Sequence, residues 1–196
     1  MAAVIDKPEL MLPAEEADWL RQAYGRAGSI LEYGSGGSTA MAASMSGKVI
    51  HTVESDPEWA KSMRAWITTH PGLSPVIVHH VPLGPTTEWG MPEGPKGWRN
   101  FSRYPLGIWD EKGVDPDVVL VDGRFRVGCV LATLFRSPKP VTLYFDDYTT
   151  REKYRAVEEF IRPTEIRGRM ARFEIEPRGI EAENLLRIME LIQRPI

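Results

Sequence analysis

The sequence predicts one α/β domain over residues 1–196, built on a Rossmann-like, doubly wound and mostly parallel sheet. Predicted strands and helices alternate five times along the chain, which is typical of a parallel sheet with helices on both faces. A glycine-rich turn, Gly34-Ser35-Gly36-Gly37, joins the first strand to the helix that follows it. Doubly wound folds bind nucleotide-like cofactors at turns of this kind. The length of 196 residues suits a single domain with a full core.

The first part of the chain contains three predicted strands. Residues 1–12 indicate an extended lead-in, and Pro13 opens a helix over 13–28 with apolar residues at three- and four-residue spacing. Ser38 and Thr39 are candidate N-caps for a second helix, and Asp56-Pro57 for a third. The strands are expected at 29–33, 49–53 and 76–81, and the second and third helices at 38–45 and 57–69.

Residues 82–116 differ in composition from the rest of the chain. Seven prolines and glycines fall from Gly84 to Gly97, which excludes a regular helix there. The region is too aromatic for a disordered linker, and its aromatic residues are Trp89, Trp98, Phe101, Tyr104 and Trp109. We therefore expect an ordered insertion that forms a lid over the substrate or cofactor. The alternative is that its tryptophans only pack the insertion onto the body of the domain.

The second part of the chain returns to regular elements. A β-branched run over 117–122 predicts a buried central strand. Two short strands around Gly168-Arg169 predict an antiparallel hairpin at the C-terminal end of the sheet. A last helix over 181–193 is expected, although its alternation also fits a strand. The remaining elements are a strand at 141–145, helices at 125–135 and 150–161, and hairpin strands at 164–167 and 170–175.

Composition excludes several classes of protein. The net charge is −3, so no overall positive field favours nucleic acid or an anionic membrane. No apolar run approaches the roughly 20 residues of a membrane span, and the first residues lack the pattern of a signal peptide. The one cysteine, Cys129, excludes an intrachain disulfide and a cysteine zinc site. We expect a cytoplasmic protein with a small-molecule substrate and no nucleic-acid or membrane partner. A homodimer is one assembly that we consider.

Carboxylates follow four of the five main predicted strands. Because parallel strands end at one edge of the sheet, these side chains should meet where such folds bind ligands. Helix capping explains one or two of them but hardly all. Glu54 comes 22 residues after Glu32, which suits a carboxylate that accepts hydrogen bonds from ribose hydroxyls. The full set is Glu32, Glu54, Asp122, Asp146 and Asp147.

The loop favours one cofactor over another. A dinucleotide fingerprint requires a third glycine or alanine, and Thr39 stands at that place. No basic residue accompanies the loop to meet a pyrophosphate, and Glu32 would repel one. S-adenosylmethionine carries a ribose and cationic groups without a phosphate, so it suits these residues better than NAD. An NAD-dependent oxidoreductase stays open as a less favoured alternative.

The motifs resemble those of class I S-adenosylmethionine-dependent methyltransferases. The segments Glu32-Tyr33-Gly34-Ser35-Gly36-Gly37-Ser38 and Val53-Glu54-Ser55-Asp56 look like their first and second motifs. The match continues in Leu120-Val121-Asp122-Gly123-Arg124 and in Tyr144-Phe145-Asp146-Asp147, and it spans about residues 10–176. Over this span the chain resembles a bacterial methyltransferase-like group that is related in layout to catechol O-methyltransferases. The resemblance implies a cofactor site made of Glu32, Gly34, Ser35, Gly36, Ser38, Glu54, Ser55 and Asp122.

The same resemblance implies O-methylation of a small molecule and a divalent cation such as Mg²⁺. Asp122, Asp146 and Asp147 fall on the metal positions, with Asp147 in place of an asparagine, and Asp122 is the candidate catalytic residue. The related enzymes have a lysine base where this chain has Phe125. Arg124 and Arg126 are too basic for that role, so they either bind an acidic substrate or pair with the aspartates, as Arg151 also could. A non-catalytic protein that binds S-adenosylmethionine is the other alternative.

Overall fold

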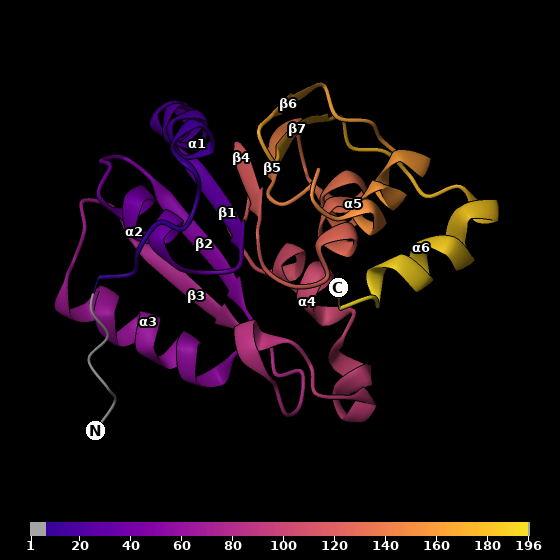
Figure 1. Ribbon diagram of the computed structural model, residues 1–196, viewed down its shortest axis with the longest axis horizontal. Coiled ribbons are helices and arrows are strands. Elements are labelled where there is room, and N and C mark those ends of the chain that lie inside the picture. Colours follow the sequence, from indigo (N-terminus) through magenta and orange to yellow (C-terminus); the bar gives the residue numbers. More distant parts are fainter. Residues whose placement is uncertain (1–6, 196) are drawn as a thin grey trace.

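The computed structural model describes residues 7–195 and shows a seven-stranded sheet between two layers of helices (Figure 1). The strand order is β3-β2-β1-β4-β5-β7-β6. The first five strands in this order are parallel, while β7 is antiparallel to both β5 and β6. The strands are β1 (Ser29–Tyr33), β2 (Val49–Glu54), β3 (Val76–His80), β4 (Val118–Val121), β5 (Val141–Phe145), β6 (Glu165–Arg167) and β7 (Met170–Ile175). The predicted doubly wound sheet and C-terminal hairpin are confirmed.

Strand order reverses between β1 and β4, which lie side by side although two strands and the insertion separate them in sequence. The chain runs from β1 outward to β3 and then returns to start again at β4. Ligands of open α/β sheets bind at such a switch point, outside the carboxyl ends of the strands. The candidate site is therefore expected where Tyr33, Glu54 and Val121 end their strands.

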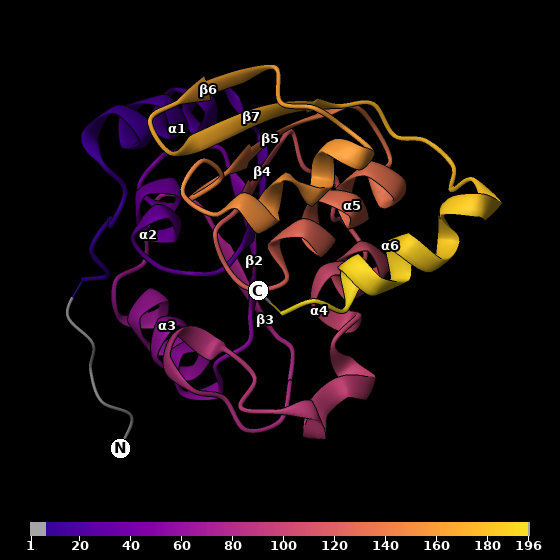
Figure 2. The same cartoon turned by 45° about the vertical axis from the view of Figure 1, so that its right-hand side comes forward.

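Helices cover both faces of the sheet. Figures 1 and 2 show α1, α2 and α3 on one side and α4, α5 and α6 on the other. Asp56 caps α3, because its carboxylate accepts hydrogen bonds from the Glu58 and Trp59 nitrogens at 2.9 Å, as the Asp56-Pro57 signal predicts. The helices are α1 (Ala14–Arg26), α2 (Gly37–Ala43), α3 (Pro57–Thr69), α4 (Arg103–Leu106), α5 (Arg126–Arg136) and α6 (Leu185–Ile192).

Alternate residues of the central strands enter two hydrophobic cores. In β4, Val119 and Val121 pack with α5 and α6, whereas Val118 and Leu120 pack with α1 and α2. All four residues are buried. Burial on both faces explains why the run is continuously apolar rather than alternating, and it holds the end of β4 rigidly beside β1.

Three predicted helices differ from expectation in start, type or extent. α2 begins at Gly37 with Gly36 as its N-cap, so the N-cap prediction for Ser38 and Thr39 is wrong. Residues 150–161 form a 3₁₀ helix, η4 (Glu152–Glu159), in place of an α-helix. Its buried residues, Tyr154 and Val157, are three apart, a spacing that a three-residue turn also places on one side. The last predicted helix divides into η5 (Ala182–Asn184) and α6, so the strand alternative is wrong.

The insertion over 82–116 is ordered and packs on the body of the domain. Phe101, Tyr104 and Ile108 enter the core around α5. Trp89 and Trp98 do not pack in this way, since 77% and 57% of their surfaces are exposed, so the packing alternative is wrong for these two. Its helical turns are η1 (Glu88–Gly90), η2 (Pro95–Asn100), α4 and η3 (Gly107–Asp110). The lid role stays a prediction.

Residues 1–6 of the predicted lead-in, together with residue 196, lie outside the described residues. Within residues 7–195, none of the helices combines the length and apolar character needed to cross a bilayer.

Candidate cofactor and active site

The glycine loop after β1 is held against the loop after β4. Gly34 has φ = +103°, a conformation that favours glycine, and its nitrogen donates a hydrogen bond to the Val53 carbonyl at 2.9 Å. A Cβ at Gly34 would lie 3.0 Å from the Gly123 nitrogen. Glycine is therefore required both by the turn and by the close approach of the loop that contains Asp122.

The next two glycines of the loop have different roles. A Cβ at Gly36 would enter open space, so the backbone there can be approached by a ligand. A Cβ at Gly37 would overlap the backbone of Glu9 and Leu10. The N-terminal segment thus crosses directly over the start of α2, a long-range contact that the motif alone does not reveal.

Glu32 is completely buried and acts on the loop through neighbouring hydroxyls. Its carboxylate accepts hydrogen bonds from Tyr24, at 2.7 Å, and from Thr39. The Thr39 hydroxyl also accepts a hydrogen bond from the Gly36 nitrogen at 3.0 Å. Burial raises the pKa of Glu32 to about 7, although the hydroxyl hydrogen bonds oppose this effect. Glu32 therefore positions the glycine loop through Thr39, the residue at the third-glycine position, whose hydroxyl bonds both the Glu32 carboxylate and the Gly36 nitrogen.

Glu54 lies at the end of β2 with all of its acceptor positions in use. One carboxylate oxygen accepts hydrogen bonds from the Ser35 nitrogen at 3.3 Å and the Ser35 hydroxyl at 2.9 Å. The other accepts from the Ser55 and Asp56 nitrogens at 2.7 and 3.0 Å. The Ser55 hydroxyl in turn donates to the Gly90 carbonyl at 3.0 Å. The first and second motifs and the insertion therefore meet at Glu54.

Asp122 is the carboxylate of the β4 loop and is partly exposed to solvent. Its side chain is 40% exposed although protein surrounds it closely, and Arg126 lies 3.0 Å from one of its oxygens. Burial raises the pKa of Asp122 to about 6, with further increase from Asp146 and Asp147 and opposition from Arg126. An accessible carboxylate of this kind can contact a ligand and is mostly ionised at neutral pH.

Asp146 and Asp147 follow β5 and contact arginines. Arg169 holds both oxygens of Asp146 at 2.9 Å, and Asp147 lies 3.3 Å from Arg126 and 3.6 Å from Arg151. A bidentate guanidinium uses the carboxylate oxygens that a cation would need. In residues 7–195 no group of three or more histidine, cysteine or acidic side chains is arranged to hold a metal ion. The expected Mg²⁺ ligands, Asp122, Asp146 and Asp147, do not fit a divalent cation as they are arranged here.

Phe125 closes the position where related enzymes have a lysine. It is buried with φ = +52° and packs against Phe101 and Tyr104, with ring centroids 5.3 and 5.5 Å apart. No titratable group can act from this place. The ion pairs of Arg126 and Arg151 agree with the alternative that arginines neutralise the aspartates. Arg169 was not among the expected partners.

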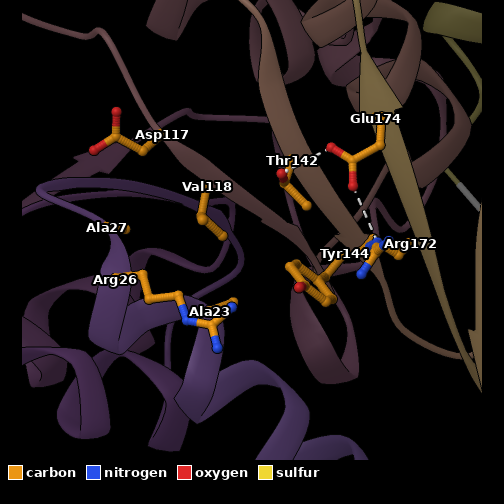
Figure 3. A pocket seen from close by; sticks show the side chains of 9 residues that line it. All are labelled: Ala23, Arg26, Ala27, Asp117, Val118, Thr142, Tyr144, Arg172 and Glu174. Atoms are coloured by element: carbon orange, nitrogen blue, oxygen red, sulfur yellow. Dashed lines mark hydrogen bonds and ion pairs between the residues drawn. The ribbon is translucent and has the colours of Figure 1, made fainter.

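A separate surface pocket of 350 Å³ lies at the opposite edge of the sheet, between α1 and strands β4, β5 and β7 (Figure 3). Three of its charged groups already have partners: Arg172 contacts Glu174 at 3.0 Å, and Asp117 accepts hydrogen bonds from the Gly28 and Ser29 nitrogens. Because it lies toward the amino ends of the parallel strands β4 and β5, this pocket is separate from the residues that the motifs bring together.

Comparison with solved structures identifies the family. A methyltransferase-like protein from Silicibacter pomeroyi is 46% identical, with 96% of this chain and 99% of that one covered and a TM-score of 0.92. The chain belongs to this methyltransferase-like family. An O-methyltransferase from Bacillus cereus in complex with S-adenosylhomocysteine (SAH) is 17% identical, with 86% and 84% covered and a TM-score of 0.57. The O-methyltransferase TomG from Streptomyces achromogenes, in complex with S-adenosylmethionine, is also 17% identical, with 86% and 83% covered and a TM-score of 0.56.

The two distant structures show that the methyltransferase-like chain has the class I methyltransferase fold. No family model and no curated protein matches the sequence. Within this fold, the loop after β1, Glu54 after β2 and Asp122 after β4 are brought together at the switch point.

Proposed function

We propose that this methyltransferase-like chain binds S-adenosylmethionine at the carboxyl ends of β1, β2 and β4 and transfers its methyl group to an oxygen of a small molecule. The observation that carries the proposal is Glu54, which joins the glycine loop to the second motif through Ser35 and Ser55. The Bacillus cereus enzyme with bound SAH and TomG with bound S-adenosylmethionine share the fold and support this choice of ligand.

The residues around the loop have distinct roles in this proposal. Glu54 accepts the ribose hydroxyls, which take the place of the Ser35 hydroxyl on its carboxylate. The open backbone at Gly36 lets the ligand lie against the loop. The remaining proposed cofactor residues are Gly34, Ser38, Ser55 and Asp122, with Glu32 acting through Thr39. Bound S-adenosylmethionine supplies a methyl group on a sulfonium, which is open to in-line attack.

Asp122 is proposed to act at the reacting end of the cofactor. It is ionised above about pH 6 and its side chain is 40% exposed, so it can hold the cationic amine and face the acceptor. Asp122→Asn keeps the shape but removes the charge. Loss of turnover with unchanged SAH affinity would assign it a catalytic role, and loss of affinity would assign it to the cofactor. If turnover and SAH affinity were both unchanged, the catalytic role and the cofactor-binding role of Asp122 would both be rejected.

Isothermal titration calorimetry with SAH tests the cofactor site. We expect binding by the wild type and an affinity about 10- to 100-fold lower in Glu54→Gln, because the amide presents N–H groups to backbone N–H donors. Glu58→Gln is the matched control, since the Glu58 side chain is 83% exposed on α3. Absence of heat with the wild-type protein would reject the proposal.

Three further points are open to direct tests. A non-catalytic binding protein would bind SAH but methylate no acceptor. An NAD-dependent oxidoreductase would be stabilised against heat by NAD and not by S-adenosylmethionine. The expected homodimer and cytoplasmic location stay predictions, and light scattering would test the dimer.

A further inference from the structure

Positive charge exceeds negative charge where β4 and β5 end. Asp122, Asp146 and Asp147 lie there and each contacts at least one arginine, and a fourth carboxylate, that of Glu16, accepts a hydrogen bond from the Arg169 backbone nitrogen at 2.9 Å. Two additional cations, Arg124 and Lys153, form no ion pair with any carboxylate in residues 7–195. We call Arg124, Arg151 and Lys153 the basic cluster. Burial lowers the pKa of Lys153 most, and the charges of Arg151, Arg194 and Arg124 lower it further.

Arg124 is the member of the basic cluster with a buried polar atom that has no hydrogen-bond partner within residues 7–195. It is half-buried in the loop directly after Asp122, and its Nε atom is fully buried with no hydrogen-bond partner in the described part of the chain. Burial lowers the pKa of the Arg124 guanidinium, and Arg126 and Arg151 lower it further by repulsion. An unsatisfied guanidinium in a partly dry position is costly, and an anion would supply both the missing acceptor and the missing charge.

The surroundings hold the cluster in place. The guanidinium carbons of Arg126 and Arg151 lie 5.6 and 5.7 Å from the centre of the buried Tyr154 ring. Arg126 is fixed by Asp122 and Asp147, whereas Arg151 is 42% exposed and lies 3.6 Å from Asp147. Arg151 can therefore turn part of its fork towards a ligand without leaving a buried charge behind.

Within residues 7–195, the lack of a group that could remove a proton from the acceptor also favours an anionic ligand. Phe125 fills the place of the lysine base, and the aspartates do not fit a metal that would acidify a hydroxyl. The Asp122 carboxylate is paired with Arg126 at 3.0 Å, which makes it a poor acceptor for the proton of an alcohol or phenol. A carboxylate acceptor is already ionised at neutral pH and needs no base.

We propose that the methyl acceptor is a small-molecule carboxylate, held by Arg124 and Arg151 and methylated on its own oxygen to give a methyl ester. One carboxylate oxygen attacks the methyl carbon, the carbon–sulfur bond breaks and its electron pair stays on sulfur. The anion and the sulfonium become a neutral ester and a neutral thioether, so no proton is transferred. This inference rests on the proposed function and specifies its acceptor.

The test uses tritiated S-adenosylmethionine with a panel of aliphatic and aromatic carboxylic acids. Amides and alcohols with the same carbon skeletons form the comparison panel. Methyl esters release labelled methanol in alkali, whereas ethers and N-methyl products do not. We expect alkali-labile product from the acid panel alone. Alkali-stable product, labelling confined to alcohols, or no labile product from the acids while SAH binds would each overturn the inference. Failure of SAH binding would instead reject the proposed function.

A matched pair of variants assigns the role of Arg124. Arg124→Gln should lower kcat/KM for the best acid by about 10- to 100-fold and leave the SAH dissociation constant within twofold. Arg124→Lys should recover part of the activity, because it restores the charge without the fork. Arg155→Gln, at an exposed position of η4, is the control and should change neither value. An equal loss of SAH affinity in Arg124→Gln would place Arg124 on the cofactor and overturn the inference.

Discussion

Replacement of Glu32 by glutamine should alter the pH dependence of stability in a defined direction. The Glu32 side chain is inaccessible to solvent and accepts hydrogen bonds from two hydroxyls, so glutamine can keep its shape and part of its bonding. Burial raises its pKa to about 7, from 4.5 for the free side chain. Between about pH 4.5 and pH 7, the folded protein therefore keeps a proton on Glu32 that the unfolded chain has lost.

The magnitude follows from this difference. Since the unfolded chain binds fewer protons in this range, the free energy of unfolding falls by about 1.4 kcal/mol for each pH unit. From pH 4.5 to pH 7 the wild type should therefore lose about 3 kcal/mol through Glu32, and the loss levels off above pH 7. Glu32→Gln carries no such charge and should lack this contribution. The variant should thus gain stability relative to the wild type as pH rises from 5 to 8.

Urea denaturation at pH 5, 6, 7 and 8, followed by circular dichroism, measures the effect. Glu58→Gln is the control, because the Glu58 side chain on α3 is 83% exposed to solvent. The same dependence on pH in Glu32→Gln and wild type would refute the reasoning. SAH affinity provides a second readout: a residue that only positions the loop should leave it within about threefold, whereas a direct charge contact with the cofactor would cost more.

The remaining predictions concern the loop, the amino edge and the metal. Gly37→Ala should reduce stability by about 1–3 kcal/mol and weaken SAH binding, because the methyl group overlaps the backbone of Glu9; thermal denaturation and calorimetry would measure both. Asp117→Ala should cost about 1–2 kcal/mol in urea denaturation with little change in SAH affinity, since it leaves the Gly28 and Ser29 nitrogens without their acceptor. EDTA should leave methyl transfer unchanged, and activity restored by added Mg²⁺ would contradict the arginine ion pairs.

The sequence predicts those parts of the fold that depend on local pattern. The Asp56-Pro57 signal sets the start of α3, and the β-branched run after Asp117 gives β4, because both depend on neighbours in the chain. The carboxyl-edge position of Asp122 follows from strand direction alone. Helix type was harder to predict: residues 150–161 have the apolar spacing of a helix but wind as a 3₁₀ helix.

Contacts between segments that are distant in sequence could not be predicted from local sequence patterns. Gly37 looks like part of a cofactor loop, yet the structure shows that it accommodates the backbone at Glu9, a contact with no local signal. Arg169 is a partial exception. The predicted hairpin turn at Gly168-Arg169 precedes an antiparallel strand next to β5, so that turn must return to the edge where Asp146 lies. Strand direction would have identified the pair.

At the carboxyl edge of the sheet, the acidic side chains beside β1 and β2 have different partners from those beside β4 and β5. This difference indicates on which side the methyl donor and the acceptor of the proposed reaction would bind. Beside β1 and β2, the partners of Glu32 and Glu54 are hydroxyls and backbone amides, and a hydroxyl-bearing ligand can replace the Ser35 hydroxyl on Glu54 without separating an ion pair. Beside β4 and β5, the partners are guanidinium groups, and Arg124 adds charge beyond what the aspartates use. A sulfonium donor on the first side and a carboxylate on the second would meet near Asp122 with opposite charges that cancel on methyl transfer. A neutral acceptor would gain nothing from this separation of charge.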